Sequence, residues 1–504
     1  MAKLYVFGIG GTGGRVLKSL TMLLATGVQT KFEIVPIIID PDGAGGDLNR
    51  TSKILREYQQ IHDAIDNYQH SDFFKNKITT LGNIAKDQKK GGKIFDGFQF
   101  ELNGIQNDKF KDFIGYNSMD TNNMALTELL FSDKNLNADL EVGFKGNPNI
   151  GSVVLNQFTK SEFYHNFATN FQTDDRIFII SSIFGGTGAA GFPLLLKNIR
   201  KGRIDNANYE ALKNAKIGAI TVQPYFTLGK NDDSEIDSHN FITKTKAALN
   251  YYATSVTGNN SVNAMYYIGD VAKTEYENIE GGESQKNKAH FVELASALSV
   301  IDFASMEDFD LEVNEGTAVS PKYKEFGIKD CKTISFNELY PRTEKLIKKN
   351  LTKYFYFNLF EKERIIKNLK DPFAREHQPQ IDENFFSYPF FKTLEDFNKS
   401  FRIWLAELKD NDISFAPFAI NVVKDNQHTI TDFTIGSDNI FTLLNNISER
   451  KTGGFGLFQK KNFELYRAEL NNSADEIEDA PDVSKRYIGI FSKATQTLID
   501  TKLF

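Results

Sequence analysis

The segment that most restricts the fold is residues 176–191, which read RIFIISSIFGGTGAAG. It starts with an apolar run, Ile177 to Ile180, of the kind found in strands buried on both faces of a sheet. A glycine-rich turn follows at 185–191 and continues into a helix-like apolar segment, 192–199. Such a turn favours anion binding, because glycines let the backbone approach a phosphate and the helix start offers free N–H groups. A tight turn without a ligand is the alternative interpretation.

A second strand–glycine–helix pattern lies at the start of the chain. Apolar residues at 3–7 predict the first strand, and an amphipathic helix is expected over 15–26. The glycine turn between them matches GxGxxG and contains Gly8, Gly10, Gly11, Thr12 and Gly13. This spacing is equally typical of dinucleotide-binding folds.

The next expected strand, 32–39, ends at Asp40. An acidic group at this position could meet the ribose hydroxyl of a nucleotide. The surrounding sequence DPDG is also typical of a turn, and turn formation explains Asp40 equally well.

Strand-like and helix-like segments alternate up to residue 304. Further strands are expected at 216–225 and 263–268, and helices at 240–255 and 286–304. The last helix is apolar nearly all round, which indicates burial between layers. This alternation predicts an α/β fold with a doubly wound, mostly parallel sheet.

The pattern changes beyond residue 306. A long helical stretch is expected at 336–364, bent at Pro341, and strands are expected at 420–423 and 429–435. We therefore expect a nucleotide-binding domain at 1–285, a central helix at 286–305 and a divergent α+β C-terminal domain at 306–504.

Composition excludes several classes of protein. The chain has 504 residues, 40% hydrophobic and 25% charged, with a net charge of −7, which argues against a nucleic-acid surface. Cys331 is the single cysteine and the seven histidines lack metal-ligand spacing, so a disulfide framework or a histidine–cysteine metal site is not expected. No apolar run approaches the ~18 residues of a membrane span, so we expect a cytoplasmic protein without membrane insertion.

Several motifs occur in the order found in the tubulin and FtsZ superfamily. The GGTGAAG turn resembles its GGGTGTG signature, and the loop at 143–151, with Gly146 and Asn147, is similar to the FtsZ loop near the terminal phosphate. The segment 219–230 resembles the following FtsZ strand. The resemblance covers roughly residues 1–305 and indicates a divergent bacterial tubulin-like protein.

The resemblance implies GTP or GDP across the carboxyl ends of the strands, with Mg²⁺ between the β- and γ-phosphates. It also implies that Asn287 hydrogen-bonds the guanine edge and that His290 or Phe291 stacks on the base. Helix capping is the alternative role for Asn287. The residues expected at the nucleotide are Gly8, Gly10, Gly11, Thr12, Gly13, Asp40, Gly146, Asn147, Gly185, Gly186, Thr187, Gly188 and Asn287.

One part of the sequence departs from the family pattern. Superfamily members carry a loop NxDxx[DE] after the central helix, whose acids act on the nucleotide of the next subunit. Here residues 305–316 read SMEDFDLEVNEG, which is acidic but lacks that pattern. Asp308 and Asp310 are the candidate catalytic acids, and a solvated acidic loop is the alternative.

The sequence therefore predicts a GTP-binding protein, a GTPase that assembles head-to-tail into cytoskeletal filaments or a larger complex. A protein partner for the C-terminal region is a further expectation. Two other classes stay open: a dinucleotide-dependent or adenylating enzyme, which also places GxGGxG after its first strand, and a non-catalytic assembly scaffold.

Overall fold

The computed structural model describes most of the chain. The residues outside the description are 67, 88–94, 101, 103, 104, 106, 107, 141, 142, 145, 230–240, 271–273, 277–281, 326–330, 438, 446–462, 478, 479 and 504. Lys230, at the end of the segment that resembles an FtsZ strand, lies among them.

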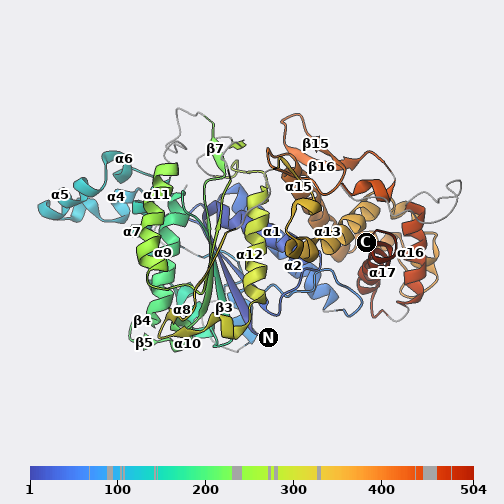
Figure 1. The fold of residues 1–504 in the computed structure, drawn as a ribbon, viewed down its shortest axis with the longest axis horizontal. Coiled ribbons are helices and arrows are strands. Elements are labelled where there is room, and N and C mark those ends of the chain that lie inside the picture. The colour runs from blue at the N-terminus through green and yellow to red at the C-terminus, as the bar shows by residue number, and fades with distance from the viewer. Residues whose placement is uncertain are drawn as a thin grey trace.

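Six parallel strands form the central sheet, in the order β12-β8-β6-β3-β1-β2. Helices cover both of its faces (Figure 1). The predicted α/β class with a parallel, doubly wound sheet is confirmed. The strands are β1 Lys3–Ile9, β2 Glu33–Ile39, β3 Arg176–Ser182, β6 Lys216–Val222, β8 Ala264–Ile268 and β12 Lys322–Glu325.

The order of the strands reverses between β1 and β3. From β1 the chain moves to β2 on one side, and the later strands are added on the other side, beginning with β3. Gly8 of β1 is paired with Ile180 of β3, so the two glycine turns leave the same edge of the sheet as neighbours. In open α/β sheets this switch point, at the carboxyl edge, is where ligands bind.

Two layers of helices enclose the sheet. On one face α1 packs against α2 and α12, and on the other α9 packs against α7 and β3 (Figure 1). The helices of this α/β part are α1 Gly10–Ala25, α2 Gly46–Ile65, α7 Pro148–Val154, α8 Glu162–Asn170, α9 Gly186–Lys201, α11 Phe241–Tyr252 and α12 Phe291–Ser305. None of the described helices is long and apolar enough to cross a membrane.

The C-terminal segments add four long helices and a hairpin. Helix α15 packs against α2 of the α/β part, and Trp404 on α15 is buried there with its indole N–H donating to Ser19 Oγ at 3.1 Å. These elements are α13 Pro341–Glu363, α15 Pro389–Lys409, α16 Phe463–Asp475, α17 Val483–Leu498, β15 Ile420–Lys424 and β16 Ile430–Ile435. Both parts of the chain contribute to one continuous apolar core.

The smaller elements complete the fold, and α4, α5 and α6 project from its body (Figure 1). The short helices are α3 Leu81–Asp87, α4 Phe110–Phe113, α5 Thr121–Leu130, α6 Asp133–Leu136, α10 Glu210–Lys213 and α14 Pro372–Arg375. The short strands are β4 Arg203–Ile204, β5 Ala207–Asn208, β7 Phe226–Leu228, β9 Thr274–Tyr276, β10 Val313–Asn314, β11 Thr317–Ala318, β13 Thr333–Ile334 and β14 Ser414–Phe415.

Several helices begin at other residues than predicted. The first helix starts at Gly10 rather than at residue 15, so most of the first glycine turn is itself helical. The central helix starts at Phe291, not at 286. Pro341 begins α13 instead of bending it, because proline fits the first helical turn, where its missing N–H costs nothing.

Glycine is required where α1 leaves β1. A Cβ added to Gly13 would lie 2.5 Å from the carbonyl carbon of Gly8 and 3.2 Å from Ile180 O. A Cβ at Gly14 would meet no atom within 4 Å. The close approach at Gly13 keeps the start of α1 against the sheet.

This contrast predicts opposite effects of alanine at adjacent positions. Gly13→Ala should lower the free energy of unfolding by about 1–3 kcal/mol, because the methyl group forces α1 away from β1. Gly14→Ala should raise it by up to about 1 kcal/mol, because alanine favours the helix. Urea unfolding measures both, and an equal loss in the two variants would contradict this packing.

Candidate functional site

A cavity of about 170 Å³ lies at the carboxyl edge of the sheet, between the two glycine turns. We call it the glycine-turn cavity. Ten of the residues predicted to contact a nucleotide line it, namely Gly10, Gly11, Thr12, Asp40, Gly146, Gly185, Gly186, Thr187, Gly188 and Asn287. Gly8, Gly13 and Asn147 do not line the cavity. Gly8 and Gly13 instead form the close contact between α1 and β1.

Two helix N-termini face this cavity with their N–H groups uncapped. Helices α1 and α9 have 16 residues each, no side chain caps either N-terminus, and neither has an acidic residue in its first turn. The first N–H groups of a helix lack partners within it, and the helix dipole makes that end positive. By contrast, the side chains of His290 and Glu293 cap α12. The ends of α1 and α9 can therefore hold an anion.

The two glycine turns pack directly on one another. Gly10 has φ +72°, in the left-handed region that favours glycine, and a Cβ there would lie 3.4 Å from Thr187 Cβ. A Cβ on Gly186 would lie 3.0 Å from the backbone nitrogen of Asn147 and 3.1 Å from that of Gly146. The start of α7 thus lies behind the second glycine turn, as the third wall of the site.

Two carboxylates lie at the end of β2, beside the glycine turns. The side chain of Asp40 accepts a hydrogen bond from the Asp42 backbone N–H at 3.2 Å, so it does form the expected turn, and it also lines the cavity. Burial raises the pKa of Asp40 to about 7, and the charge of Asp42 adds to the increase. Asp42 Oδ2 accepts from the Gly282 N–H at 2.8 Å.

Arg15 is the main residue of the site that sequence reasoning missed. Its guanidinium is almost fully buried and lines the cavity from the second turn of α1. It donates to Glu293 at 2.5 Å, Asp47 at 3.1 Å, Tyr225 at 2.9 Å and Thr12 at 3.3 Å. Burial alone would lower the pKa of Arg15, but these acidic and phenolic neighbours raise it well above its usual value.

Asn287 lies in the wall of the cavity but not in a helix. Its amide donates to Asp47 Oδ2 at 3.2 Å, and its backbone carbonyl accepts from Arg50. The alternative role of helix cap is wrong, because His290 caps α12 through a 3.1 Å bond from the Val292 N–H.

The aromatic lining of the cavity differs from the prediction. His290 and Phe291 do not line it: His290 is fully buried at the helix start, and Phe291 packs on Phe415 at 5.6 Å between ring centroids. The aromatic residues that do line it are Phe144, Phe184, Phe226 and Phe241. The rings of Phe184, Phe226 and Phe241 contact one another, with centroids 4.9–6.2 Å apart.

The two candidate catalytic acids lie at the other edge of the sheet. Asp308 accepts from Arg176 at 2.7 Å and from Lys216 at 2.8 Å, and these residues begin β3 and β6. Hydrogen bonding from Lys216 and Arg176 lowers the pKa of Asp308 to about 2. Asp310 pairs with Lys322, which begins β12, at 2.6 Å. The structure therefore does not bring these acids to the glycine-turn cavity of the same chain.

One surface group in the described part of the chain combines three side chains that can bind a metal. Glu376, His377 and Asp475 place one ligand atom each within 4.8 Å of one another. His377 and Asp475 already share a 2.8 Å hydrogen bond. The histidine spacing in the sequence did not indicate this group, because its members come from segments about a hundred residues apart.

Known proteins resemble this chain in structure only; no family model and no curated protein matches its sequence. It resembles CetZ2 from Haloferax volcanii, a GTPγS-bound protofilament, at 12% identity and TM-score 0.29, covering 61% of this chain and 60% of that one. It also resembles CetZ1 of the same organism, a GDP-bound monomer, at 10% identity and TM-score 0.26, covering 61% of this chain and 61% of that one. CetZ from Methanosaeta thermophila is similar at 16% identity and TM-score 0.22, covering 60% of this chain and 51% of that one.

The chain thus spans about three fifths or less of the length of these three proteins. At these TM-scores the likeness carries no argument about this chain, whose fold rests on its own strand order.

The raised pKa of Asp40 predicts how stability depends on pH. Burial disfavours the charged carboxylate in the folded protein. The free energy of unfolding is therefore higher at about pH 4, and it falls as pH rises towards about 7 and Asp40 must ionise. Asp40→Asn should match the wild type at about pH 4 and exceed its free energy of unfolding by about 2 kcal/mol at about pH 8. Urea unfolding across this range measures the difference. The exposed Asp174→Asn should show no such trend, and a parallel trend in both variants would contradict the prediction.

Proposed function

We propose that this protein binds a guanine nucleotide, GTP or GDP, in the glycine-turn cavity. The observation that carries the proposal is the convergence of two uncapped helix N-termini, α1 and α9, on one cavity at the switch point of a parallel sheet. Each end offers unpaired N–H groups and a positive dipole to a phosphate. Two such ends suit a chain of phosphates better than a single anion.

In this proposal each glycine turn binds a different part of the phosphate chain. The backbone of residues 185–188 and the hydroxyl of Thr187 bind one part of the phosphate chain, and Gly10, Gly11 and Thr12 bind the α- and β-phosphates. Asn147 lies near the third phosphate through its position behind Gly186. Asn287, fixed by Asp47, hydrogen-bonds the base, with Phe184, Phe226 or Phe241 in place of His290 as the aromatic contact.

Mg²⁺ fits the donors present at the end of β2. Asp40 and Asp42 offer the carboxylate oxygens that Mg²⁺ prefers, and a cation there would offset the burial that raises the pKa of Asp40. When bound, the ion neutralises charge that develops between the β- and γ-phosphates.

A dinucleotide-dependent enzyme is the weaker alternative. Such a fold needs one glycine turn after the first strand. The second helix N-terminus, at Gly186, has no role in such an enzyme, whereas a nucleoside triphosphate uses the N-termini of both α1 and α9. Selective binding of NAD over GTP would favour this alternative.

We further propose that hydrolysis, where it occurs, needs a second copy of the chain. Asp308 and Asp310 lie at the amino edge of the sheet, on the side away from the glycine-turn cavity. To bring them to a bound nucleotide, a second copy must place its amino edge against the carboxyl edge of the first. Phe309, between them, is 73% exposed. A contact that joins two different edges is heterologous and generates open filaments.

Thr187 offers a test of phosphate binding that spares the fold. Thr187→Glu places a carboxylate in the first turn of α9, where the helix dipole favours it, but this charge repels a phosphate. GTP affinity should fall by about tenfold or more. Thr187→Gln, similar in size and uncharged, should bind within a few-fold of the wild type. Calorimetric titration with GTP, GDP, ATP and NAD measures this, and equal affinity in the Glu and Gln variants would count against the site.

Hydrolysis should depend on protein concentration if two chains form the catalytic site. The GTP turnover per chain should rise with concentration, and Asp308→Asn with Asp310→Asn should reduce it by about tenfold or more. The matched control is Glu315→Gln, which changes an exposed acid in the turn between β10 and β11. Turnover that is constant with concentration and unchanged in the double variant would remove these acids from the mechanism. Urea unfolding of each variant shows whether a loss of activity comes from a fold that is less stable without the Asp308 ion pairs.

A further inference from the structure

Three side chains with metal-binding atoms lie together on the C-terminal segments. Glu376 and His377 directly follow α14, and Asp475 is the last residue of α16. Figure 1 shows α16 at the end of the molecule opposite the projecting helices α4, α5 and α6. We call these three residues the carboxylate–histidine group. Within the described part of the chain, no other group of histidine, cysteine and acidic side chains has this spacing.

The ligand atoms of the carboxylate–histidine group are close enough to share one ion. One atom from each side chain lies within 4.8 Å of the other two, and His377 Nε2 is 2.8 Å from Asp475 Oδ1. Ligand atoms about 2.0–2.1 Å from a tetrahedral Zn²⁺ ion lie about 3.3–3.4 Å from one another. Glu376 is exposed, so rotation of its side chain is enough to bring its carboxylate to the same ion.

The two carboxylates of the group form no ion pair with a lysine or arginine among the described residues. Asp475 pairs with His377, and Glu376 forms no ion pair there. The residue after Asp475 shows the usual arrangement at a surface, because Glu476 pairs with Lys493 at 2.7 Å. Two carboxylates beside a neutral imidazole therefore leave negative charge that attracts a cation.

The contact between His377 and Asp475 can hold a metal ion in place of a hydrogen. Asp475 Oδ1 is an acceptor, and one nitrogen of a neutral imidazole carries a proton while the other offers a lone pair. With the proton on Nδ1, Nε2 of His377 is the free donor of electrons to a metal. The proton then stays on the ring, so binding needs no other reactant.

Two contacts outside the group fix the segment after α14 against α16. Asn471, one helical turn before Asp475, accepts at Oδ1 from the Phe373 N–H at 3.0 Å. Arg467, a further turn back on α16, pairs with Asp371 just before α14. The backbones that present the ligands are thus already in place, which lowers the cost of ordering the site when an ion binds.

The donor atoms of the group select the class of ion. Mg²⁺ and Ca²⁺ prefer oxygen ligands alone, whereas an imidazole nitrogen favours Zn²⁺ and similar transition-metal ions. Three protein ligands leave one position of a tetrahedral ion for water.

We infer that Glu376, His377 and Asp475 form a binding site for a divalent transition-metal ion of the Zn²⁺ type. The ion bridges the segment after α14 and the end of α16, and water completes its coordination. This site is independent of the nucleotide proposed above, and it differs from the proposed Mg²⁺ site in containing a nitrogen ligand.

Co²⁺ reports binding directly, because its visible absorption strengthens when protein ligands replace water and the coordination number falls. The untagged full-length protein, without nucleotide and with Mg²⁺ in excess, is titrated with Co²⁺, and Zn²⁺ is then added as a competitor. We expect a saturable absorption that Zn²⁺ removes. A spectrum equal to that of Co²⁺ in buffer would overturn the inference.

Matched variants locate the ion. Glu376→Gln and His377→Gln each remove one ligand, so the affinity for Zn²⁺ should fall by about tenfold or more, since even loss of a residue that only orients a ligand costs about 10–100-fold. Glu376→Gln breaks no ion pair with a described residue and serves if His377→Gln unfolds.

Two control variants should bind Zn²⁺ as the wild type does. Glu383→Gln makes the same change as Glu376→Gln at an exposed acid seven residues further along. His165→Gln removes a surface histidine whose partner, Asp205, lies at 3.7 Å without a third ligand. Equal affinity in the ligand variants and the controls would place the ion elsewhere and overturn the inference.

Discussion

The guanidinium of Arg15 joins the start of α1 to three other parts of the fold. It contacts Asp47 at the start of α2, Glu293 at the start of α12, and Tyr225 after β6. All four side chains are buried, so removal of the Arg15 guanidinium would leave the buried carboxylate of Glu293 without its paired cation, at a cost of about 3–5 kcal/mol. The position of the first glycine turn, and so the shape of the glycine-turn cavity, depends on this network.

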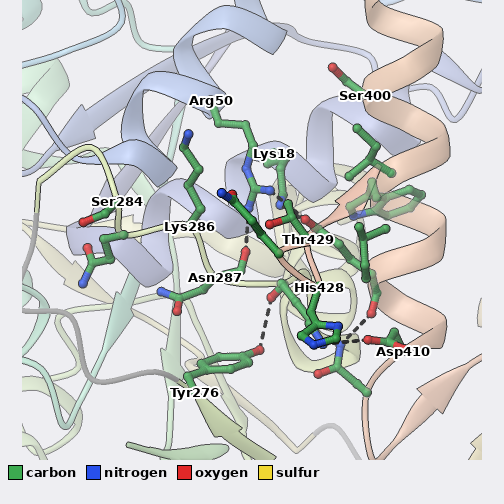
Figure 2. A pocket seen from close by; sticks show the side chains of 18 of the residues that line it. Lys18, Arg50, Tyr276, Ser284, Lys286, Asn287, Ser400, Asp410, His428 and Thr429 are labelled. Carbon is green, nitrogen blue, oxygen red and sulfur yellow. Dashed lines mark hydrogen bonds and ion pairs between the residues drawn. The ribbon is translucent and has the colours of Figure 1, made fainter. Parts of the chain in front are cut away.

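The same charges continue into the C-terminal segments. Asp47 also accepts from Arg50 at 3.0 Å, and Arg50 donates to Glu407 of α15, which pairs with Lys18. The network therefore runs from the wall of the glycine-turn cavity to a second cavity of about 570 Å³ beside α15 (Figure 2), and Asn287 lines both.

The sequence predicts the sheet well and the site in part. Apolar runs followed by glycines at Gly10 and Gly186 identify the strands, the turns and the switch point, because these features are local. The Arg15–Glu293 contact joins residues 278 positions apart, and no local pattern indicates it. The cap of α12 is local, but the expected helix began at 286 instead of Phe291, which put Asn287 rather than His290 at its start. The second cavity, beside α15, depends on how α15 packs on α2, which periodicity does not specify.

The parallel sheet gives the molecule two chemically different edges. Every helix that follows a parallel strand begins at the carboxyl edge, so positive helix ends gather there and suit an anion. At the amino edge, Arg176, Lys216 and Lys322 begin their strands and hold the carboxylates of Asp308 and Asp310. These acids are thus already oriented by fixed cations, and a second chain meeting this edge would encounter carboxylates in defined positions. The polarity of the strands therefore places the positive helix ends and the ion-paired acids at opposite ends of one molecule, and the proposed head-to-tail association rests on this arrangement.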